Sequence, residues 1–485
     1  MGALPVARCD LTSARTVVVT RRGALAQAAI WPLGAYAATA CRATESKREV
    51  VTTLTWLVPG NPRNETEAKQ ALLARFNDQN PDIVAKPQVE EPRDYATKLE
   101  ALIEAGVEPD VLTIDGVLLP KLANRNALFD LVRLARVEGR GGNTFLDQYQ
   151  PQYLEASRRD ARLFGLPVAA RQAVLYVNKT IFQGAGVPLP PVEWEDPSWT
   201  WTNFLARAHA VTRVSGNQRM SQAGVLMTGR HLMWMAWILQ NGGRLFNRTL
   251  TRSLLDQPEV IDAIQWLANL IHKEFVAPLP SDWSNFTFQK GNVAMHVDFT
   301  SQFAWFAGQI KNTFQWDIYP LPHEKQLGTY AEWNYYAVSA RTTAPDKAWR
   351  LAKFLASPEG DGAQLQSGIS TPILRGTEPL FLDDNPIAAG KNRGVGAAAP
   401  GIPMLPRPFI EWWPQVLNIL STEFSRVWNN QTRAYYACRN VKPIVDAVLE
   451  TGLPPAPSPV PGGPEPAPAP APVPAESGPA AGEGG

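Results

Sequence analysis

The chain has 485 residues, 45% of them hydrophobic, and a formal net charge of +1. This length and apolar content suffice for two hydrophobic cores, and the balanced charge argues against a nucleic-acid-binding protein. The 16 Trp outnumber the 5 His, so aromatic faces are plentiful while imidazoles for metal binding or proton transfer are few.

Residues 1–41 are expected to be an export signal and not part of the fold. Residues 20–25 read Thr-Arg-Arg-Gly-Ala-Leu, which is similar to a twin-arginine motif, and the Ala-rich run after them is too short and weakly apolar for a membrane helix. Residues 38–41 then resemble a lipobox, in which Cys41 becomes the lipidated first residue, although Ala38 stands where that motif prefers Leu. The same residues also fit an ordinary A-x-A cleavage site, so a lipid anchor and simple secretion both stay open.

The mature chain is expected to open with a strand, a loop and a helix. Val51–Leu57 alternates and is rich in β-branched residues, a Pro-Gly-Asn-Pro breaker follows, and Asn64 can cap the next helix. Loops at the carboxyl ends of parallel strands bind ligands in open α/β sheets, because the next helix offers free N–H donors there. Asn61 and Arg63 are therefore candidate ligand contacts, or they form only the turn.

The same pattern recurs in the next segment. A helix from Tyr95 is expected to end at Gly106, and a short buried strand, Val111–Asp115, follows it. Asp115 at the strand's carboxyl end is either a ligand contact or a cap for the helix that starts after it.

The stretch 166–182 is the centre of the predicted fold. Val174–Val177 is apolar on both faces, as a strand buried inside an α/β sheet should be. Because burying an unpaired guanidinium is costly, Arg171 just before this strand is expected at a surface or in a cleft.

Later segments predict further helices and a tail. Residues 230–243 form an apolar run that ends in two glycines, Val260 to Ile271 follows a helical repeat, and Pro345–Leu355 has proline in its first turn. A Trp-rich helical region spans 411–439. Residues 453–485 are almost entirely Pro, Ala, Gly, Ser and Glu, so they are predicted to be a disordered tail.

Several motifs, in one order, resemble the extracellular solute-binding proteins of ABC sugar importers, the maltose-binding-like family 1. The resemblance covers roughly residues 50–450. The motifs that carry it are, in chain order, Leu166-Pro167 with Tyr176-Val177-Asn178-Lys179, Phe286 through Ala294-Met295, Pro320-Leu321-Pro322, Ala348-Trp349 with Phe354-Leu355, and residues 368–372. The chain departs from the family at Val177, where a second aromatic is usual, and after Met295, where the usual Gly-x-Trp is absent. This second departure leaves open whether Phe299 or Trp305 stacks on a ligand.

The resemblance implies a two-lobed α/β periplasmic-binding-protein fold of type II. Each lobe would be a mixed sheet flanked by helices, and a multi-strand hinge would join the lobes. Lobe I is expected to comprise residues 42–168 and 335–372, and lobe II residues 169–334 and 373–452.

The resemblance also implies a ligand site in the cleft between the lobes. Together with the candidates above, the expected ligand-binding residues are Asn61, Arg63, Asp115, Arg171, Arg230, Trp234, Phe299, Ser301, Trp305, Trp333, Ser370 and Trp412. Trp305 and Trp333 are expected to meet the ligand and to contribute little to folding. Trp201, Trp237 and Trp349 are assigned to the core.

The expected function is that of the substrate-binding component of an ABC importer, which captures a sugar or oligosaccharide and delivers it to the permease. The protein would be a monomer on the outer face of the cell membrane, lipid-anchored through Cys41, or periplasmic or secreted without the lipid. No HExxH, G-x-S-x-G, P-loop or CxxC motif occurs, so no enzyme activity, cofactor or metal is expected. Two alternatives stay open: a secreted carbohydrate-active hydrolase, and the same fold binding an organic anion through Arg63, Arg171 and Arg230.

Overall fold

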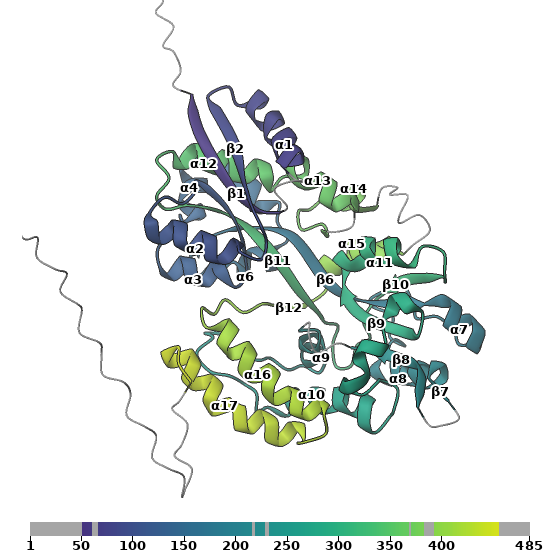
Figure 1. The fold of residues 1–485 in the computed structure, drawn as a ribbon. Helices are drawn as coiled ribbons and strands as arrows, with labels where there is room; N and C mark the ends of the chain where they lie inside the picture. The colour runs from purple at the N-terminus through teal and green to yellow at the C-terminus, as the bar shows by residue number, and fades with distance from the viewer. Residues whose placement is uncertain are drawn as a thin grey trace, which may run out of the picture. The chain divides into compact units, whose positions relative to one another are not determined.

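The computed structural model of the chain describes residues 51–60, 66–215, 219–227, 232–367, 370–382 and 392–454. The predicted export signal, Cys41, the tail from residue 455 and the candidates Asn61, Arg63 and Arg230 lie outside these ranges. The described part is a mixed α/β fold, as predicted (Figure 1).

One large sheet runs through the fold in the order β2-β1-β3-β11-β6-β9-β8-β7, with β10 paired to β6 and β12 paired to β11. Its strands are β1 (Thr52–Pro59), β2 (Ile83–Glu90), β3 (Val111–Asp115), β6 (Leu166–Asn178), β7 (Arg213–Val214), β8 (Met220–Leu226), β9 (Val293–Phe299), β10 (Trp316–Tyr319), β11 (Thr329–Val338) and β12 (Met404–Pro406). A separate hairpin is made by β4 (Arg158–Arg159) and β5 (Arg162–Leu163).

The predicted first strand and the central strand are both confirmed. Val51–Leu57 corresponds to β1, and Val174–Val177 lies within β6 with no exposed surface. β1 is parallel to β2 and to β3, and β8 is parallel to β9, whereas β6 and β11 are antiparallel to each other. The sheet is therefore mixed, with parallel pairs on both sides of two antiparallel strands.

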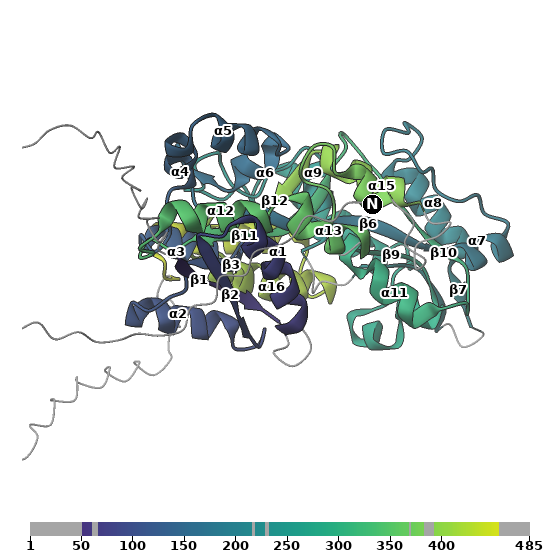
Figure 2. The same ribbon diagram turned by 90° about the horizontal axis from the view of Figure 1, so that it is seen from above.

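Two separate clusters of buried apolar side chains hold the fold together. The first core lies around β1, β2 and β3, and its helices are α1 (Thr66–Gln79), α2 (Tyr95–Ala105), α3 (Leu118–Asn124), α4 (Leu131–Glu138), α5 (Arg140–Asp147), α6 (Pro151–Ala156) and α12 (Pro345–Leu355). The predicted end of α2 at Gly106 is confirmed, since Gly106 adopts the left-handed conformation with φ 69°. Figure 2 shows α12 lying across β3 and β11, against which it packs.

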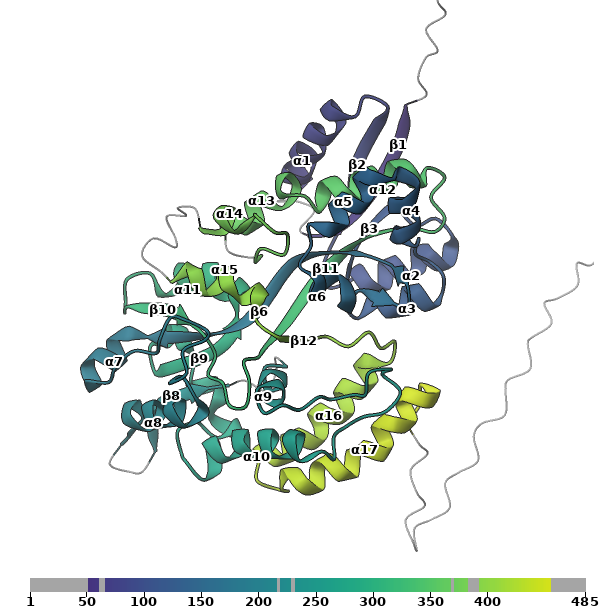
Figure 3. The same cartoon turned by 180° about the vertical axis from the view of Figure 1, so that it is seen from behind.

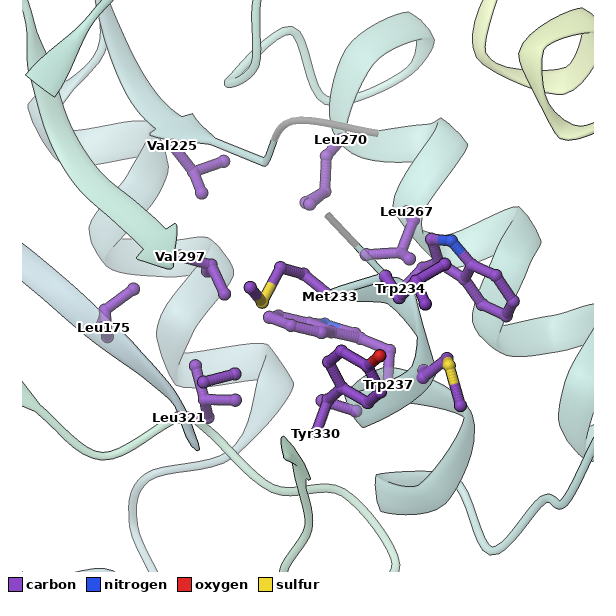
Figure 4. Packing of buried hydrophobic residues seen from close by; sticks show 14 of the residues in the cluster. Leu175, Val225, Met233, Trp234, Trp237, Leu267, Leu270, Val297, Leu321 and Tyr330 are labelled. Atoms are coloured by element: carbon purple, nitrogen blue, oxygen red, sulfur yellow. The ribbon is translucent and has the colours of Figure 1, made fainter. Parts of the chain in front are cut away.

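The second core lies around β8, β9 and β10. Its helices are α7 (Lys179–Ala185), α8 (Trp201–Val211), α9 (Trp234–Gln240), α10 (Pro258–His272), α11 (Phe303–Ile310), α15 (Arg393–Ala398), α16 (Trp413–Trp428) and α17 (Ala434–Thr451). Figure 4 shows Trp237 of α9 among Met233, Val297, Leu321 and Tyr330. The core positions predicted for Trp201 and Trp237 are confirmed, with 5% and 0% of their surface exposed.

The remaining elements are short. They are α13 (Pro358–Ser367) and α14 (Glu378–Leu382), which follow α12, and the 3-10 turns η1 (Pro280–Asn285), η2 (Phe288–Lys290), η3 (Thr300–Gln302) and η4 (Ala399–Gly401). The Trp-rich region predicted as helical consists of α16 and the start of α17, which pack side by side (Figure 1). Within the described residues, no helix is both long enough and apolar enough to span a membrane.

Two strands, β6 and β11, run through both cores (Figure 3). The first half of β6 pairs with β11 and contributes Leu166, Val168 and Ala170 to the first core. From Ala173 onward β6 pairs with β9, and its side chains belong to the second core. Thr371 adds a third connection at the same level, since its N–H donates to the carbonyl of Ala170 at 2.8 Å.

A β-bulge interrupts the pairing of β6 with β11 near this crossing. Glu332 pairs with Arg171 and Asn334 pairs with Val168, so two residues of β6 lie opposite the single residue Trp333. One of these two, Ala169, has φ 51°, which is in the left-handed region. Bulges bend a strand and re-aim its side chains, and here Glu332 and the next residue, Trp333, both line one small cavity.

Candidate ligand-binding site

A cluster of charged side chains lies where β6 and β11 cross. Arg171 Nη2 donates to Glu332 Oε2 at 2.8 Å, Arg407 Nη2 donates to Glu332 Oε1 at 2.6 Å, and the Tyr330 hydroxyl donates to the same Oε1 at 2.5 Å. We call Arg171, Tyr330, Glu332 and Arg407 the charge cluster. It joins residues from three separate segments of the chain, because β12 pairs with β11 and so places Arg407 next to Glu332.

Electrostatics keep this buried carboxylate ionised. The Glu332 side chain is only 11% exposed, and burial alone would raise its pKa, but Arg407 and Arg171 outweigh burial and hold the pKa of Glu332 below its usual range. Burial raises the pKa of the Tyr330 hydroxyl well above its usual value, so this group remains a neutral donor. Each guanidinium has five N–H donors, and the contacts with Glu332 use only some of them.

Three members of the charge cluster, Arg171, Glu332 and Arg407, line a small cavity. Its other lining residues are Asp115, Gly116, Trp333 and Tyr335. A Cβ at Gly116 would lie 3.1 Å from Cδ of Arg407, so a side chain there would crowd that arginine. The cavity has a volume of ≈ 10 Å³, which is near what a single water molecule needs.

Asp115 has the capping role that the sequence left open. Its Oδ1 accepts hydrogen bonds from the N–H groups of Val117 and Leu118, both at 2.9 Å, at the start of α3. The same carboxylate lines the cavity at the carboxyl end of β3. One side chain therefore caps a helix and borders the candidate site.

A larger hollow lies at the carboxyl ends of β8 and β9. It has a volume of ≈ 570 Å³, which is in the range of small-molecule sites. We call this hollow the aromatic pocket, and its lining residues are Leu226, Pro280, Trp283, Ser284, Phe286, Thr287, Phe288, Gln289, His296, Asp298, Gln302, Trp305 and Phe306. Trp305 of α11 is 47% exposed and offers its ring to a ligand.

Phe299 contacts the charge cluster and is next in sequence to Asp298 of the aromatic pocket. It follows Asp298 of the aromatic pocket in β9, and its ring lies under the guanidinium of Arg171, 5.4 Å from the ring centre. Phe299 is only 6% exposed and also packs against Tyr330, with 5.8 Å between ring centres. Its position favours a supporting role for Arg171, whereas Trp305 has the accessible ring.

The structure thus brings three predicted site residues, Asp115, Arg171 and Trp333, to one cavity, with Phe299 beside Arg171. The expectation that Trp333 contributes little to folding is wrong, because it is 4% exposed and packs on Tyr153 with 5.0 Å between ring centres. Trp349 is 2% exposed, as expected for a core residue.

Four other predicted site residues lie elsewhere. Ser301 is half-buried in η3, and Ser370 is fully buried next to Thr371, which pairs with Ala170. Trp234 is 6% exposed and lines a small apolar cavity with Met233 and Trp428. Trp412 is half-buried, and Gly452 at the end of α17 packs directly against its ring.

The sequence interpretation missed Glu332, Arg407, His296 and Asp298. Two signals could have found some of them. Glu332 is a lone carboxylate in an apolar strand, which requires a buried partner. His296 and Asp298 are two positions apart in another apolar strand, so their side chains share one face of the sheet.

Comparison with known proteins is consistent with this architecture. The chain resembles an ABC substrate-binding protein of Listeria monocytogenes solved with cycloalternan, at 24% identity and a TM-score of 0.68, covering 82% of this chain and 99% of that one. A cyclic alpha-maltosyl-1,6-maltose binding protein of Arthrobacter globiformis is 20% identical with a TM-score of 0.68, covering 82% and 99%. An arabinooligosaccharide-binding protein of Halalkalibacterium halodurans is 26% identical over 140 residues, which are 28% of each chain.

These likenesses confirm the two-lobed binding-protein fold that was predicted. Residues 62–362, more than half of the chain, match the family model described as bacterial extracellular solute-binding protein. The chain therefore belongs to the bacterial extracellular solute-binding proteins.

Proposed function

We propose that this protein is the substrate-binding component of an ABC importer and that it captures a sugar or oligosaccharide for delivery to a membrane permease. The observation that carries the proposal is the aromatic pocket of ≈ 570 Å³ at the carboxyl ends of the parallel strands β8 and β9. Phe299, the residue after Asp298 of that pocket, also contacts Arg171 of the charge cluster. Ring faces such as Trp305 suit the C–H faces of sugars, and the planar polar groups Asp115 and Arg171 suit their hydroxyls. The structural relatives named above bind sugars.

The two cores support the proposed division into lobes. Lobe I would comprise residues 42–168 and 335–372, and lobe II residues 169–334 and 373–452. The first core draws on residues 54–170 and 331–374, and the second on 173–330 and 395–448. Movement of the lobes about β6 and β11 would close the site around a ligand.

A thermal-shift screen over a panel of sugars tests the function. A ligand at about 100 times its dissociation constant stabilises the folded state by roughly 2.7 kcal/mol, which raises the melting temperature measurably. The absence of a shift with every sugar, in a protein shown to be folded, would contradict the proposal. Sustained release of reducing ends from an oligosaccharide would instead support a hydrolase.

An organic anion is a less favourable ligand for the charge cluster. Both guanidiniums already have an anionic partner, because Glu332 accepts from Arg171 and from Arg407. A carboxylate ligand would approach Glu332 as well as the two arginines, so repulsion would offset part of its attraction.

We further propose that the protein is exported through the twin-arginine signal and stays on the outer face of the membrane as a lipid-anchored monomer. The Arg21-Arg22 pair and the lipobox-like residues 38–41 support this proposal. A Cys41→Ala variant should then appear in the medium or remain unprocessed, because a retained protein needs the acyl chains of the lipidated cysteine. Fractionation of cells expressing each form measures this, and unchanged membrane retention of the variant would refute the anchor.

A further inference from the structure

The aromatic pocket contains a buried ionisable pair, His296 and Asp298. His296 is 6% exposed and Asp298 is 6% exposed. His296 Nε2 lies 3.2 Å from Asp298 Oδ2, and His296 Nδ1 lies 3.2 Å from the carbonyl oxygen of Leu226. Asp298 Oδ1 accepts the N–H of Phe299 at 2.7 Å.

Both ring nitrogens of His296 face acceptor oxygens. A carbonyl oxygen and a carboxylate oxygen are both acceptors, whereas a neutral imidazole has only one N–H. A neutral ring therefore donates to only one of the two oxygens, so the carboxylate of Asp298 can accept from a further donor in the pocket.

The surroundings of Asp298 also suit a cation. Trp283 and Trp305 line the same pocket, and the faces of aromatic rings, Trp above all, attract positive charge. Thr287 lines it too, and its hydroxyl oxygen is buried without a hydrogen-bond partner within the described residues. Among the described lining residues, Asp298 and His296 are the ionisable groups, whereas the charge cluster has two guanidiniums.

We propose that the aromatic pocket binds a positively charged nitrogen of the ligand, with Asp298 as its carboxylate partner and Trp305 as the ring against which it stacks. This inference rests on the proposed sugar-binding function and specifies the ligand class as sugars that carry a protonated amine. The ammonium group donates hydrogen bonds to the carboxylate of Asp298, which lines the pocket together with Trp305.

The other titratable group facing the pair is Tyr176, which lies opposite His296 in the β6–β9 ladder. Burial, with a smaller contribution from Asp298, raises the pKa of Tyr176 well above its usual value. Tyr176 donates its hydroxyl proton to the carbonyl of Phe299 at 2.7 Å. It therefore stays a neutral hydrogen-bond donor.

The test uses matched pairs of sugars that differ only in the amine, measured by isothermal titration calorimetry near pH 6. The pairs are D-glucosamine with D-glucose, D-galactosamine with D-galactose, and oligomers of glucosamine with cello-oligosaccharides of the same length. The amino sugar should bind at least about tenfold more tightly, as expected for a charged hydrogen bond. Asp298→Asn keeps an acceptor for the N–H of Phe299 but removes the charge, so the preference should fall to within about threefold.

Asp282→Asn is the matched control, because Asp282 lies on neighbouring η1, is exposed and does not line the pocket. It should keep the full preference for the amine. Melting curves of all variants verify that they are folded.

Tighter or equal binding of the neutral sugars would overturn the inference while leaving the sugar-binding function intact. Binding of choline without binding of any sugar would support the cation site and overturn the sugar assignment, and no binding of any sugar or amine would overturn both.

Discussion

At the scale of single residues, Glu332 determines whether the charge cluster is stable. Removing one member of a buried ion pair leaves the others unpaired, which typically costs about 3 to 5 kcal/mol. We expect Glu332→Gln to lower the free energy of unfolding by about this amount, because Arg171 and Arg407 both lose their anion. Urea denaturation followed by tryptophan fluorescence measures the change.

The contribution of Glu332 should also depend on pH. Its pKa is lowered in the folded protein, so its stabilisation is fully present above its unfolded value of about 4.3 and is lost as pH falls through the lower folded value. The difference in free energy of unfolding between the Glu332→Gln variant and the unaltered protein should therefore shrink as the pH falls through that acidic range. Glu104→Gln, which breaks a pair with Arg125 in which both side chains are exposed, should cost no more than about 1 kcal/mol, and an equal loss in both variants would contradict the buried-pair account.

The aromatic residues of the two hollows should respond differently to truncation. Trp305→Ala should melt near the normal temperature and lose the ligand-induced shift, because Trp305 is 47% exposed and lines the aromatic pocket. Trp333→Ala and Trp349→Ala should each lower the free energy of unfolding by about 3 to 5 kcal/mol, because both side chains are buried. Thermal melting with and without ligand separates these effects, and Tyr436→Ala, at a 58% exposed position on α17, is the control for loss of a surface aromatic.

Sequence reasoning identified part of the charge cluster. Arg171 was expected at a surface or in a cleft because burying an unpaired guanidinium is costly, and the order of motifs placed Trp333 near the hinge. Arg407 could not be found in this way, since its proximity to Glu332 follows from the pairing of β12 with β11. Such a long-range register has no signal in the local sequence.

At the scale of elements, the bulge at Ala169 stores conformational strain. The left-handed conformation costs a residue with a Cβ roughly 1 to 2 kcal/mol, which glycine avoids. Ala169→Gly should therefore stabilise the protein by up to about 1 kcal/mol in chemical denaturation, after the entropic cost of glycine is subtracted. Ala170→Gly changes the neighbouring buried alanine, which lacks this conformation, and it should destabilise by about 0.5 to 1 kcal/mol.

A destabilised Ala169→Gly variant would show that the bulge is unstrained.

The strands around the bulge were predicted from their alternating or continuous apolar patterns, and β1, β3 and β6 match those predictions. The bulge itself was not predicted, because a period-two pattern does not reveal one additional residue and Ala169 is not a glycine. Strand identity is a local property, whereas the bulge depends on the pairing of β6 with β11.

At the scale of the whole described chain, the sequence predicted the two-lobed fold because the motifs occur in the family's order over most of its length. The aromatic pocket was predicted only through Trp305. Its remaining residues come from η1, η2 and the two residues between them, and from β8, β9, η3 and α11, and only the packing of these elements brings them together. The sequence therefore indicated the fold more completely than the site.

The passage of β6 and β11 through both cores has a consequence for unfolding. A protein with two hydrophobic cores can melt in two steps when its cores are independent units. Here neither core can lose its strands without removing strands from the other, since Leu166 and Val177 belong to one strand but to different cores. Calorimetry should thus show a single transition whose calorimetric and van't Hoff enthalpies agree, and a ligand held at the crossing should raise the melting of both cores together.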